Sequence, residues 1–220
     1  KIPIKRPSIT IPLEILYEDE YLAIINKPAG ILVSGNKKYT IQNALTNCLK
    51  KSNQKDALMY PEPIHRLDYP TSGPLLIGKT TQAVILLNKM FEKQKINKKY
   101  RAITIGKQNE KGIIDSPIKG KLSKSEYNIL KSIPSKKYGF LNLIELIPHT
   151  GRTHQLRIHL SSIGNPIFGD IKYGKEGFIS KGNGLYLQSF YLCFSHPIKN
   201  NEVKIVIPLA KKFEKIFTSK

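Results

Sequence analysis

The feature that most constrains the fold is a set of short β-prone segments, separated by loops rich in glycine, proline, asparagine or lysine. Runs of β-branched and aromatic residues bounded by turn-forming residues are typical of β-strands. The predicted strands are Glu14 to Tyr17, Tyr21 to Asn26, Tyr100 to Ile105, Tyr127 to Ile133, Leu141 to Ile147, Leu185 to Phe194 and Val203 to Ile207. Because helices do not alternate regularly with these strands, the pattern predicts an α+β fold.

Three segments have the spacing and the end residues of amphipathic helices. They are Thr40 to Lys51, Thr81 to Lys95 and Thr153 to Ile163. In the third, Leu156 and Leu160 recur on one face, and Gly164 follows as a C-terminal stop. We expect Arg157 to project from the opposite face of this helix.

The chain is predicted to form a single domain after a short lead-in. Residues 1–12 alternate proline with isoleucine and lysine, and proline pairs poorly within a sheet, so we expect an extended segment there. Residues 13–220 contain no internal repeat, low-complexity tract or linker. We therefore predict one domain with a mixed, mainly antiparallel β-sheet, flanked by helices, and a central cleft.

The charge of the chain indicates a polyanionic partner. Lysine and arginine number 36 against 16 acidic residues, which gives a formal net charge of +20. Such a surface attracts RNA or DNA and speeds the encounter. The alternative is a composition effect, because the chain is rich in lysine, isoleucine and asparagine together. Arginine is more informative, since only five are present and three of them lie in the two motifs below.

Cysteine usage and hydropathy predict an intracellular protein. Cys48 and Cys193 are isolated and form no disulfide framework, which favours a reducing cytoplasm. No uncharged apolar run approaches the roughly 20 residues that cross a bilayer, and the first residues lack the apolar core of a signal peptide. We expect a cytoplasmic protein without a membrane segment.

Two dense polar motifs are the candidates for chemistry. His65 to Gly73 reads His-Arg-Leu-Asp-Tyr-Pro-Thr-Ser-Gly, and its Asp68 is one of only five aspartates. Taken alone, Asp68 also suits a turn that its side chain organises. The second motif, His149 to His159, contains three histidines, one glutamine and two arginines, which is more polar chemistry than packing requires.

Two other patterns are rejected as functional sites. Residues 73–80 match the P-loop consensus, but Pro74 lacks a backbone N–H and the following Leu-Leu-Ile is itself β-prone, so Lys79 is not expected to bind phosphate. His149, His154 and His159 recur every five residues, which places them on different faces of a helix or strand. We therefore predict no metal site.

Several segments, taken in order, resemble pseudouridine synthases of the RluA type, and His65 to Gly73 carries the signature His-Arg-Leu-Asp-x-x-Thr-Ser-Gly of that family. The similar segments are Tyr17 to Gly30, His65 to Gly73, Lys98 to Tyr100, Thr150 to Arg157, Gly169 to Gly174 and Phe194 to Pro197. The likeness covers nearly all of residues 13–208. It implies a stand-alone catalytic domain over residues 13–220, in which the cleft is catalytic.

The resemblance also implies roles for individual residues. It makes Asp68 the essential catalytic carboxylate, Tyr100 the aromatic residue that lines the base pocket, and Arg157 the partner of Asp68. Without the resemblance, Tyr100 would be read as a core residue of a strand. The predicted RNA-binding residues are Lys27, Arg66, Arg152, His154 and Gln155. For the last three, the alternative is a solvated helix start.

The implied activity is the isomerisation of uridine in ribosomal or transfer RNA, with no cofactor and no metal, by a monomer. A stacked uridine is out of reach, so the base must be extruded at a cost of roughly a few kcal/mol. The alternative is a non-catalytic RNA-binding module, in which the cations bind phosphates and Asp68 only holds a turn.

Overall fold

The computed structural model describes residues 6–178, 182 and 184–218. Residues 1–5 of the predicted lead-in lie outside the described residues, and residues 6–12 contain no helix or strand. The described chain forms two compact units, each with strands and helices, which confirms the α+β class. Within the described residues, no helix is both long and apolar enough to cross a membrane.

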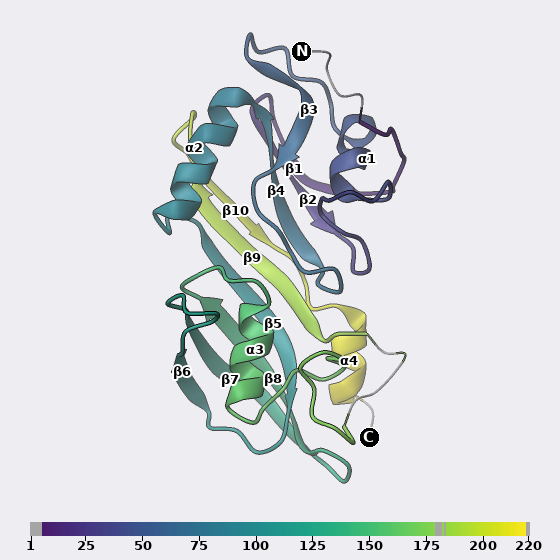
Figure 1. Ribbon diagram of the computed structural model, residues 1–220, viewed down its shortest axis with the longest axis vertical. Helices are drawn as coiled ribbons and strands as arrows, with labels where there is room; N and C mark the ends of the chain where they lie inside the picture. Colours follow the sequence, from purple (N-terminus) through teal and green to yellow (C-terminus); the bar gives the residue numbers. More distant parts are fainter. Residues whose placement is uncertain (1–5, 179–181, 183, 219–220) are drawn as a thin grey trace. The chain divides into compact units, whose positions relative to one another are not determined.

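The first unit comprises residues 1–96 and 193–205 and contains an antiparallel sheet of four strands in the order β1-β2-β4-β3 (Figure 1). Its elements are β1 (Glu14–Glu18), β2 (Leu22–Lys27), α1 (Ile41–Cys48), β3 (Ala57–Pro63), β4 (Gly73–Thr80) and α2 (Thr81–Glu92). β1 and β2 form the predicted hairpin. α1 packs against β3, and α2 packs against β4.

The central strands and the helix starts of this unit follow directly from the sequence. Leu22 to Ile25 and Leu75 to Ile77 have no exposed surface, as expected for apolar runs at the centre of a covered sheet. Both helices begin after a threonine whose hydroxyl accepts a backbone N–H: Thr40 from Asn43 at 3.3 Å, and Thr80 from Ala83 at 3.2 Å. These caps satisfy amides that have no partner within the helix.

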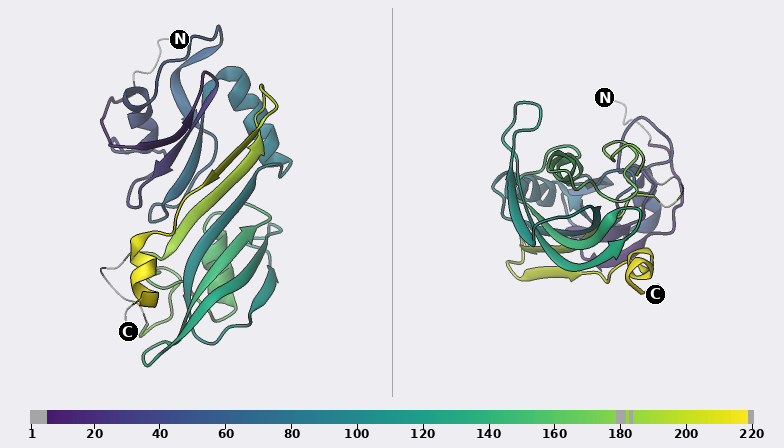
Figure 2. Two further views of the ribbon diagram at one scale, coloured as in Figure 1. Left: turned by 180° about the vertical axis from the view of Figure 1, so that it is seen from behind. Right: turned by 90° about the horizontal axis from the view of Figure 1, so that it is seen from below.

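The second unit comprises residues 97–192 and 206–220. Its elements are β5 (Asn97–Ile105), β6 (Lys111–Asp115), β7 (Lys124–Ser135), β8 (Gly139–Pro148), α3 (Gln155–Ser162) and α4 (Lys211–Thr218), and it shares β9 (Leu187–Ser195) and β10 (Glu202–Val206) with the first unit. The strand order is β10-β9-β5-β8-β7-β6, and the boundary between the units falls within β9 and β10. Figure 2 shows the strands curving, with α3 on their inner side.

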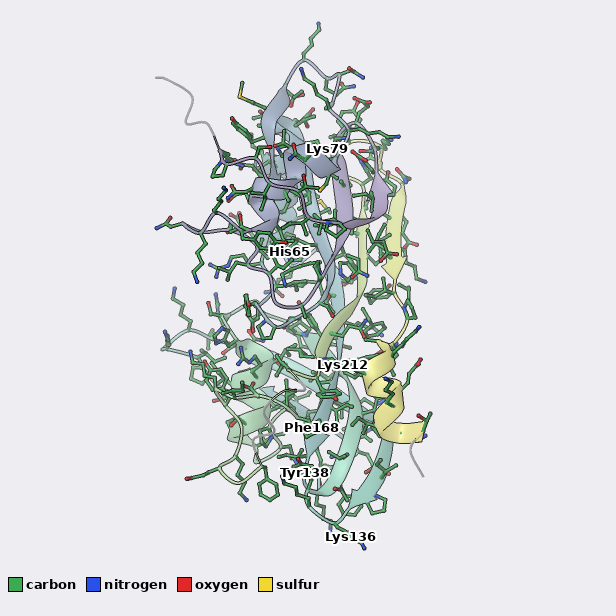
Figure 3. The ribbon with its side chains drawn as sticks, turned by 90° about the vertical axis from the view of Figure 1, so that its right-hand side faces the viewer. His65, Lys79, Lys136, Tyr138, Phe168 and Lys212 are labelled. Carbon is green, nitrogen blue, oxygen red and sulfur yellow. The ribbon has the colours of Figure 1, made fainter. Side chains whose placement is uncertain are left out.

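The core of the second unit joins the sheet to both of its helices. Leu156 and Leu160 of α3 belong to the same buried cluster as Ile144 and Leu146 of β8. Four aromatic rings from loops and from α4 pack in a row against this cluster, and the centroids of successive rings are 4.8 to 5.3 Å apart. The chain of rings is Tyr138, Phe168, Tyr186 and Phe213, of which Figure 3 labels the first two. Phe213 thereby fixes α4 to the core.

The structure differs from the sequence prediction at the edges. Two sheets are present where one was predicted, and β3, β6 and α4 were not predicted. β3 includes Pro61 and Pro63, which an edge strand tolerates because one side needs no ladder hydrogen bonds. α3 begins at Gln155 rather than Thr153, because His154 has a left-handed backbone with φ of 56°.

Candidate active site

The Asp68 loop connects β3 to β4 in the first unit, and its main chain is held by a turn and a buried anchor. The Thr71 amide donates to the Asp68 carbonyl at 3.0 Å. Leu67 is 6% exposed and points into the protein, whereas Arg66 before it is exposed. His65 accepts the Leu76 amide at its Nε2 atom, at 3.1 Å, which ties the start of the loop to β4. The Asp68 side chain is half-buried.

Lys27 is the main support of this loop. Its Nζ atom donates to the carbonyl oxygens of Pro28 and Thr71 at 2.9 Å, and lies 3.4 Å from those of Asp68 and Tyr69. The side chain has no exposed surface. Burial lowers the pKa of Lys27 to about 8, and the nearby Asp68 carboxylate opposes that shift. The buried ammonium therefore fixes the backbone from Asp68 to Thr71 by main-chain contacts.

The position of Lys27 differs from the one expected of an RNA-binding residue. Its ammonium group binds carbonyl groups of the chain itself. Because the side chain has no exposed surface, RNA in solvent cannot contact it. The structure therefore favours a positioning role for Lys27 over the predicted RNA contact. The sequence carried a signal for this role, since Lys27 ends the apolar strand β2 directly before Pro28.

Gln155 organises the start of α3 in the second unit. Its Oε1 atom accepts the Thr150 hydroxyl at 2.7 Å and the Arg152 amide at 3.0 Å. Its Nε2 atom donates to the Lys124 carbonyl at 3.0 Å and to the Ser125 hydroxyl at 2.9 Å. The residue is 4% exposed. These internal bonds favour a structural role for Gln155 over the predicted contact with phosphate or base.

Arg157 is held in place by Asp170, a residue that the sequence prediction did not include in the site. Its Nε and Nη2 atoms donate to the two carboxylate oxygens of Asp170 at 2.7 and 2.8 Å. Its guanidinium carbon lies 5.1 Å from the centroid of the Tyr173 ring. This two-point geometry fixes the plane of the guanidinium, which lysine cannot reproduce.

The Asp170 carboxylate is itself fully engaged. It is 2% exposed and also accepts the amides of Lys172 and Tyr173 at 2.9 and 3.0 Å. Burial alone would raise the pKa of Asp170, but the hydrogen bonds from Arg157 and from these amides outweigh it, so the pKa lies below its usual range. The segment Gly169 to Gly174 was recognised as a family motif, and the acid within it was the available signal.

The remaining predicted residues lie in the second unit, apart from Arg66. Tyr100 is on β5 opposite Leu146 and packs half-buried against the core cluster. Arg152 is exposed and donates from Nε to the Leu122 carbonyl at 3.1 Å. His154 is half-buried, with Nδ1 2.9 Å from the Tyr173 hydroxyl. The predicted roles of these three residues stay predictions.

Asp68 belongs to the first unit, and Arg157 and Tyr100 belong to the second. The structure of each unit brings Lys27 to the Asp68 loop, and gathers Arg152, His154, Gln155 and Arg157 at the start of α3. The predicted pairing of Asp68 with Arg157 is tested by neither unit and stays a prediction.

The P-loop pattern is a buried strand. Residues 73–80 form β4, and Lys79 is 2% exposed. Its Nζ atom binds the Glu18 carboxylate at 2.8 Å and the Asp19 carbonyl at 2.6 Å. The amide groups that would cradle a phosphate are paired in the sheet instead, as the sequence analysis expected of this segment.

The three histidines with five-residue spacing have three different environments. His149 lies 3.2 Å from the Glu126 carboxylate at the surface, and His154 bonds to Tyr173. His159 is 1% exposed, with Nδ1 2.9 Å from the Ser125 hydroxyl and Nε2 3.0 Å from the Ser116 carbonyl. Burial lowers the pKa of His159, so the neutral ring links α3 to β7.

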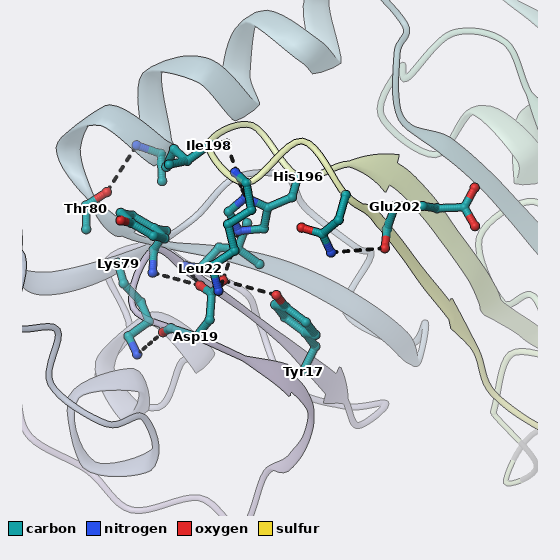
Figure 4. Close-up of polar contacts among 12 residues, drawn as sticks. Tyr17, Asp19, Leu22, Lys79, Thr80, His196, Ile198 and Glu202 are labelled. Carbon is teal, nitrogen blue, oxygen red and sulfur yellow. Dashed lines mark hydrogen bonds and ion pairs between the residues drawn. The ribbon is translucent and has the colours of Figure 1, made fainter.

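A second aspartate of the first unit, Asp19, is the centre of a polar cluster at the β1–β2 turn (Figure 4). The groups that surround its carboxylate are the Tyr17 hydroxyl at 3.1 Å, the amides of Tyr21 and Leu22 at 2.8 and 2.9 Å, Lys199 Nζ at 2.8 Å and His196 Nε2 at 3.0 Å. Burial would raise the pKa of Asp19, but the hydrogen bonds from Lys199 and the amides lower it to about 2.

His196 joins this cluster to the turn that follows β9. It has no exposed surface, and its Nδ1 atom accepts the amides of Ile198 and Lys199 at 3.2 and 3.0 Å. The Nε2 atom lies 3.0 Å from the Asp19 carboxylate. Burial lowers the pKa of His196, which favours the neutral ring.

The family model, the relatives and the solved structure described below all point to one family. The family described as RNA pseudouridylate synthase matches residues 21–162. A ribosomal large subunit pseudouridine synthase D from Zymomonas mobilis is 33% identical over 98% of this chain and 76% of its own length. A tRNA pseudouridine synthase C from Pasteurella multocida is 34% identical over 88% of this chain and 90% of its own length. The solved structure of Human RNA Pseudouridylate Synthase Domain Containing 4 has a TM-score of 0.73 at 26% identity, and covers 91% of this chain and 90% of that chain.

Proposed function

The chain belongs to the RNA pseudouridylate synthase family, as its motif order predicted, and on that premise we propose that it isomerises specific uridines in ribosomal or transfer RNA. Asp68 is the catalytic carboxylate of this proposal. The enzyme acts as a monomer in the cytoplasm, with residues 13–220 as its catalytic domain, and requires no cofactor or metal.

One observation carries the proposed role of Asp68: its loop is fixed through the main chain. The buried Lys27 ammonium holds the carbonyl groups of Asp68, Tyr69 and Thr71, so the position of the loop does not depend on hydrogen bonds to the Asp68 side chain alone. A reacting group held in this way keeps its geometry while its side chain meets a substrate. The half-buried carboxylate suits contact with a base that has left its stack.

The proposed reaction balances within the nucleotide. The bond between ribose C1′ and uracil N1 breaks, the uracil turns over, and a bond between C1′ and C5 forms. The hydrogen on C5 leaves as a proton and N1 gains a proton, so no oxidant or reductant is consumed. In this reaction the Asp68 carboxylate adds to the uracil ring, attacks the anomeric carbon or removes a sugar proton.

The other predicted residues complete the proposal. Arg157, oriented by Asp170, is the partner of Asp68 and stabilises charge that develops during the reaction. Tyr100 lines the base pocket. Arg66, Arg152 and His154 contact the RNA, and the first two are exposed as this role requires.

Tritium release tests the proposed reaction. RNA that carries tritium on C5 of uracil loses the label when the carbon–carbon bond forms. We expect the native chain to release tritium from cellular RNA, and Asp68→Asn to release none while it binds the same RNA with equal affinity. Equal release by both proteins would contradict the role of Asp68. Binding without release by the native chain would support the non-catalytic module instead.

The salt dependence of binding tests the proposed surface. If about five phosphates are neutralised, the slope of log affinity against log salt is roughly −3.5 for single-stranded contacts. Replacement of the exposed Arg66 by alanine should reduce the magnitude of that slope by about 0.7. A flat response of the native chain would contradict phosphate contacts altogether.

A further inference from the structure

Tyr69 is a large aromatic side chain that follows Asp68 directly and is 55% exposed. Single exposed apolar residues are common and by themselves indicate nothing. This one differs because its backbone is immobilised. The Tyr69 carbonyl accepts the Gly30 amide at 2.8 Å and lies 3.4 Å from Lys27 Nζ, and Pro70 restricts the backbone of Tyr69 to extended conformations. The ring therefore projects into solvent from a fixed segment of backbone.

The ring is open to solvent, and the turn that contains Gly30 is one of its neighbours. A methyl group added at Gly30 would lie 4.0 Å from the Tyr69 hydroxyl oxygen, so the ring extends towards the turn that contains Gly30. Ala29 and Gly30 of that turn are exposed. Arg66, three residues before Tyr69, is exposed as well. The combination of an aromatic face and a cation in solvent matches the chemistry of a nucleobase and its phosphate.

We infer that Tyr69 stacks on a nucleobase near the extruded uridine, and so helps to bind the RNA strand. The inference rests on the proposed function, because the uridine itself must meet Asp68. Asp68 and Tyr69 are consecutive residues with Cα atoms about 3.8 Å apart, so a single RNA strand that enters this loop can reach both side chains. Stacking on the ring fixes the strand on one side of the gap that extrusion leaves. The loss of one such stack weakens binding roughly 10- to 100-fold.

A single tryptophan reporter tests the stacking directly, because the chain contains no tryptophan. Tyr69→Trp places one indole beside Asp68, and Tyr39→Trp places one at another exposed tyrosine of the same unit, 57% exposed. The probes are a single-stranded oligouridylate and inorganic polyphosphate. We expect oligouridylate to quench the Tyr69→Trp fluorescence, polyphosphate to leave it unchanged, and Tyr39→Trp to respond to neither. Equal quenching at both positions, or none at position 69 when filter binding shows bound RNA, would overturn the inference.

Substitutions at the same position connect stacking to turnover. Tyr69→Ala should lower the single-turnover efficiency of tritium release roughly 10-fold or more, whereas Tyr69→Phe keeps it, since phenylalanine retains the ring. If Tyr69→Ala released tritium with the efficiency of the native chain and had an unchanged urea midpoint, the inference would be overturned. If the native chain releases no tritium while Tyr69→Trp is still quenched, the proposed function fails and the stacking remains supported.

Discussion

Two aspartates of the first unit are immobilised in opposite ways. Asp19 is fixed through its carboxylate, which a tyrosine hydroxyl, two amides, a lysine and a histidine surround. The Asp68 loop is fixed through its backbone, because Lys27 and the Thr71 amide bind main-chain carbonyl groups. In the first arrangement, the carboxylate itself stabilises the fold. The second holds the loop by main-chain contacts, which stay in place when the carboxylate acts on a substrate.

A third aspartate, Asp170, extends the comparison to the second unit and should have the largest effect on stability. Asp170→Asn removes the buried carboxylate charge that Arg157 binds through two hydrogen bonds, and breaking such a pair costs about 3 kcal/mol or more. We expect urea unfolding to show a loss of this order. The exposed Asp115→Asn is the matched control and should change the midpoint little. A loss no greater than that of the control would mean that Arg157 does not depend on Asp170.

Lys27→Met tests whether the contacts of Lys27 with main-chain carbonyl groups hold the Asp68 loop in place. Methionine fills the space but cannot bind the carbonyl groups, so the loop loses its geometry, and a displacement of about 1 Å can cost 10²-fold in rate. We expect turnover to fall about that much while RNA affinity is unchanged. Lys38→Met, at an exposed lysine of the same unit, controls for the loss of one charge. Reduced affinity with native turnover would restore the predicted RNA contact of Lys27.

Asp19→Asn should cost about 2 kcal/mol of unfolding free energy near neutral pH, because the folded pKa is about 2 against a reference value of 3.8. A lowered pKa contributes stability that is complete above the unfolded value and is lost as the pH falls through the folded value. Urea curves of the native chain and the variant should therefore converge as the pH approaches about 2. A difference that is independent of pH would show that packing, and not charge, is responsible.

The sequence predicted the parts of the fold that depend on local chemistry. The β1–β2 hairpin follows from β-prone runs on either side of Asp19 and Glu20, and the first helix begins after the predicted Thr40. The second helix was predicted from Thr81, and its capping residue is Thr80. The edge strand β3 was missed because its prolines argue against a strand until its place in the sheet is known. Local patterns do not specify which strand lies at an edge.

The sequence located the polar side chains of the candidate site but not the directions in which they point. Lys27 and Gln155 were predicted to contact RNA because they are polar members of motifs that resemble those of the family. The side chains of both residues instead point inward and bind groups of the chain itself. The clusters of Asp19 with His196, and of Arg157 with Asp170, join segments that only the folded chain brings together. Such pairs depend on tertiary structure, so the number of charged residues in the sequence does not predict them.

The most direct test of the division between the two aspartates measures tritium release and urea unfolding on the same variants. Asp68→Asn should lose at least about 10³-fold in turnover, while it loses less unfolding free energy than Asp19→Asn. Asp19→Asn should lose stability and retain turnover at temperatures where it is folded. An Asp68→Asn protein that is as unstable as Asp19→Asn, or that still turns over, would contradict this account.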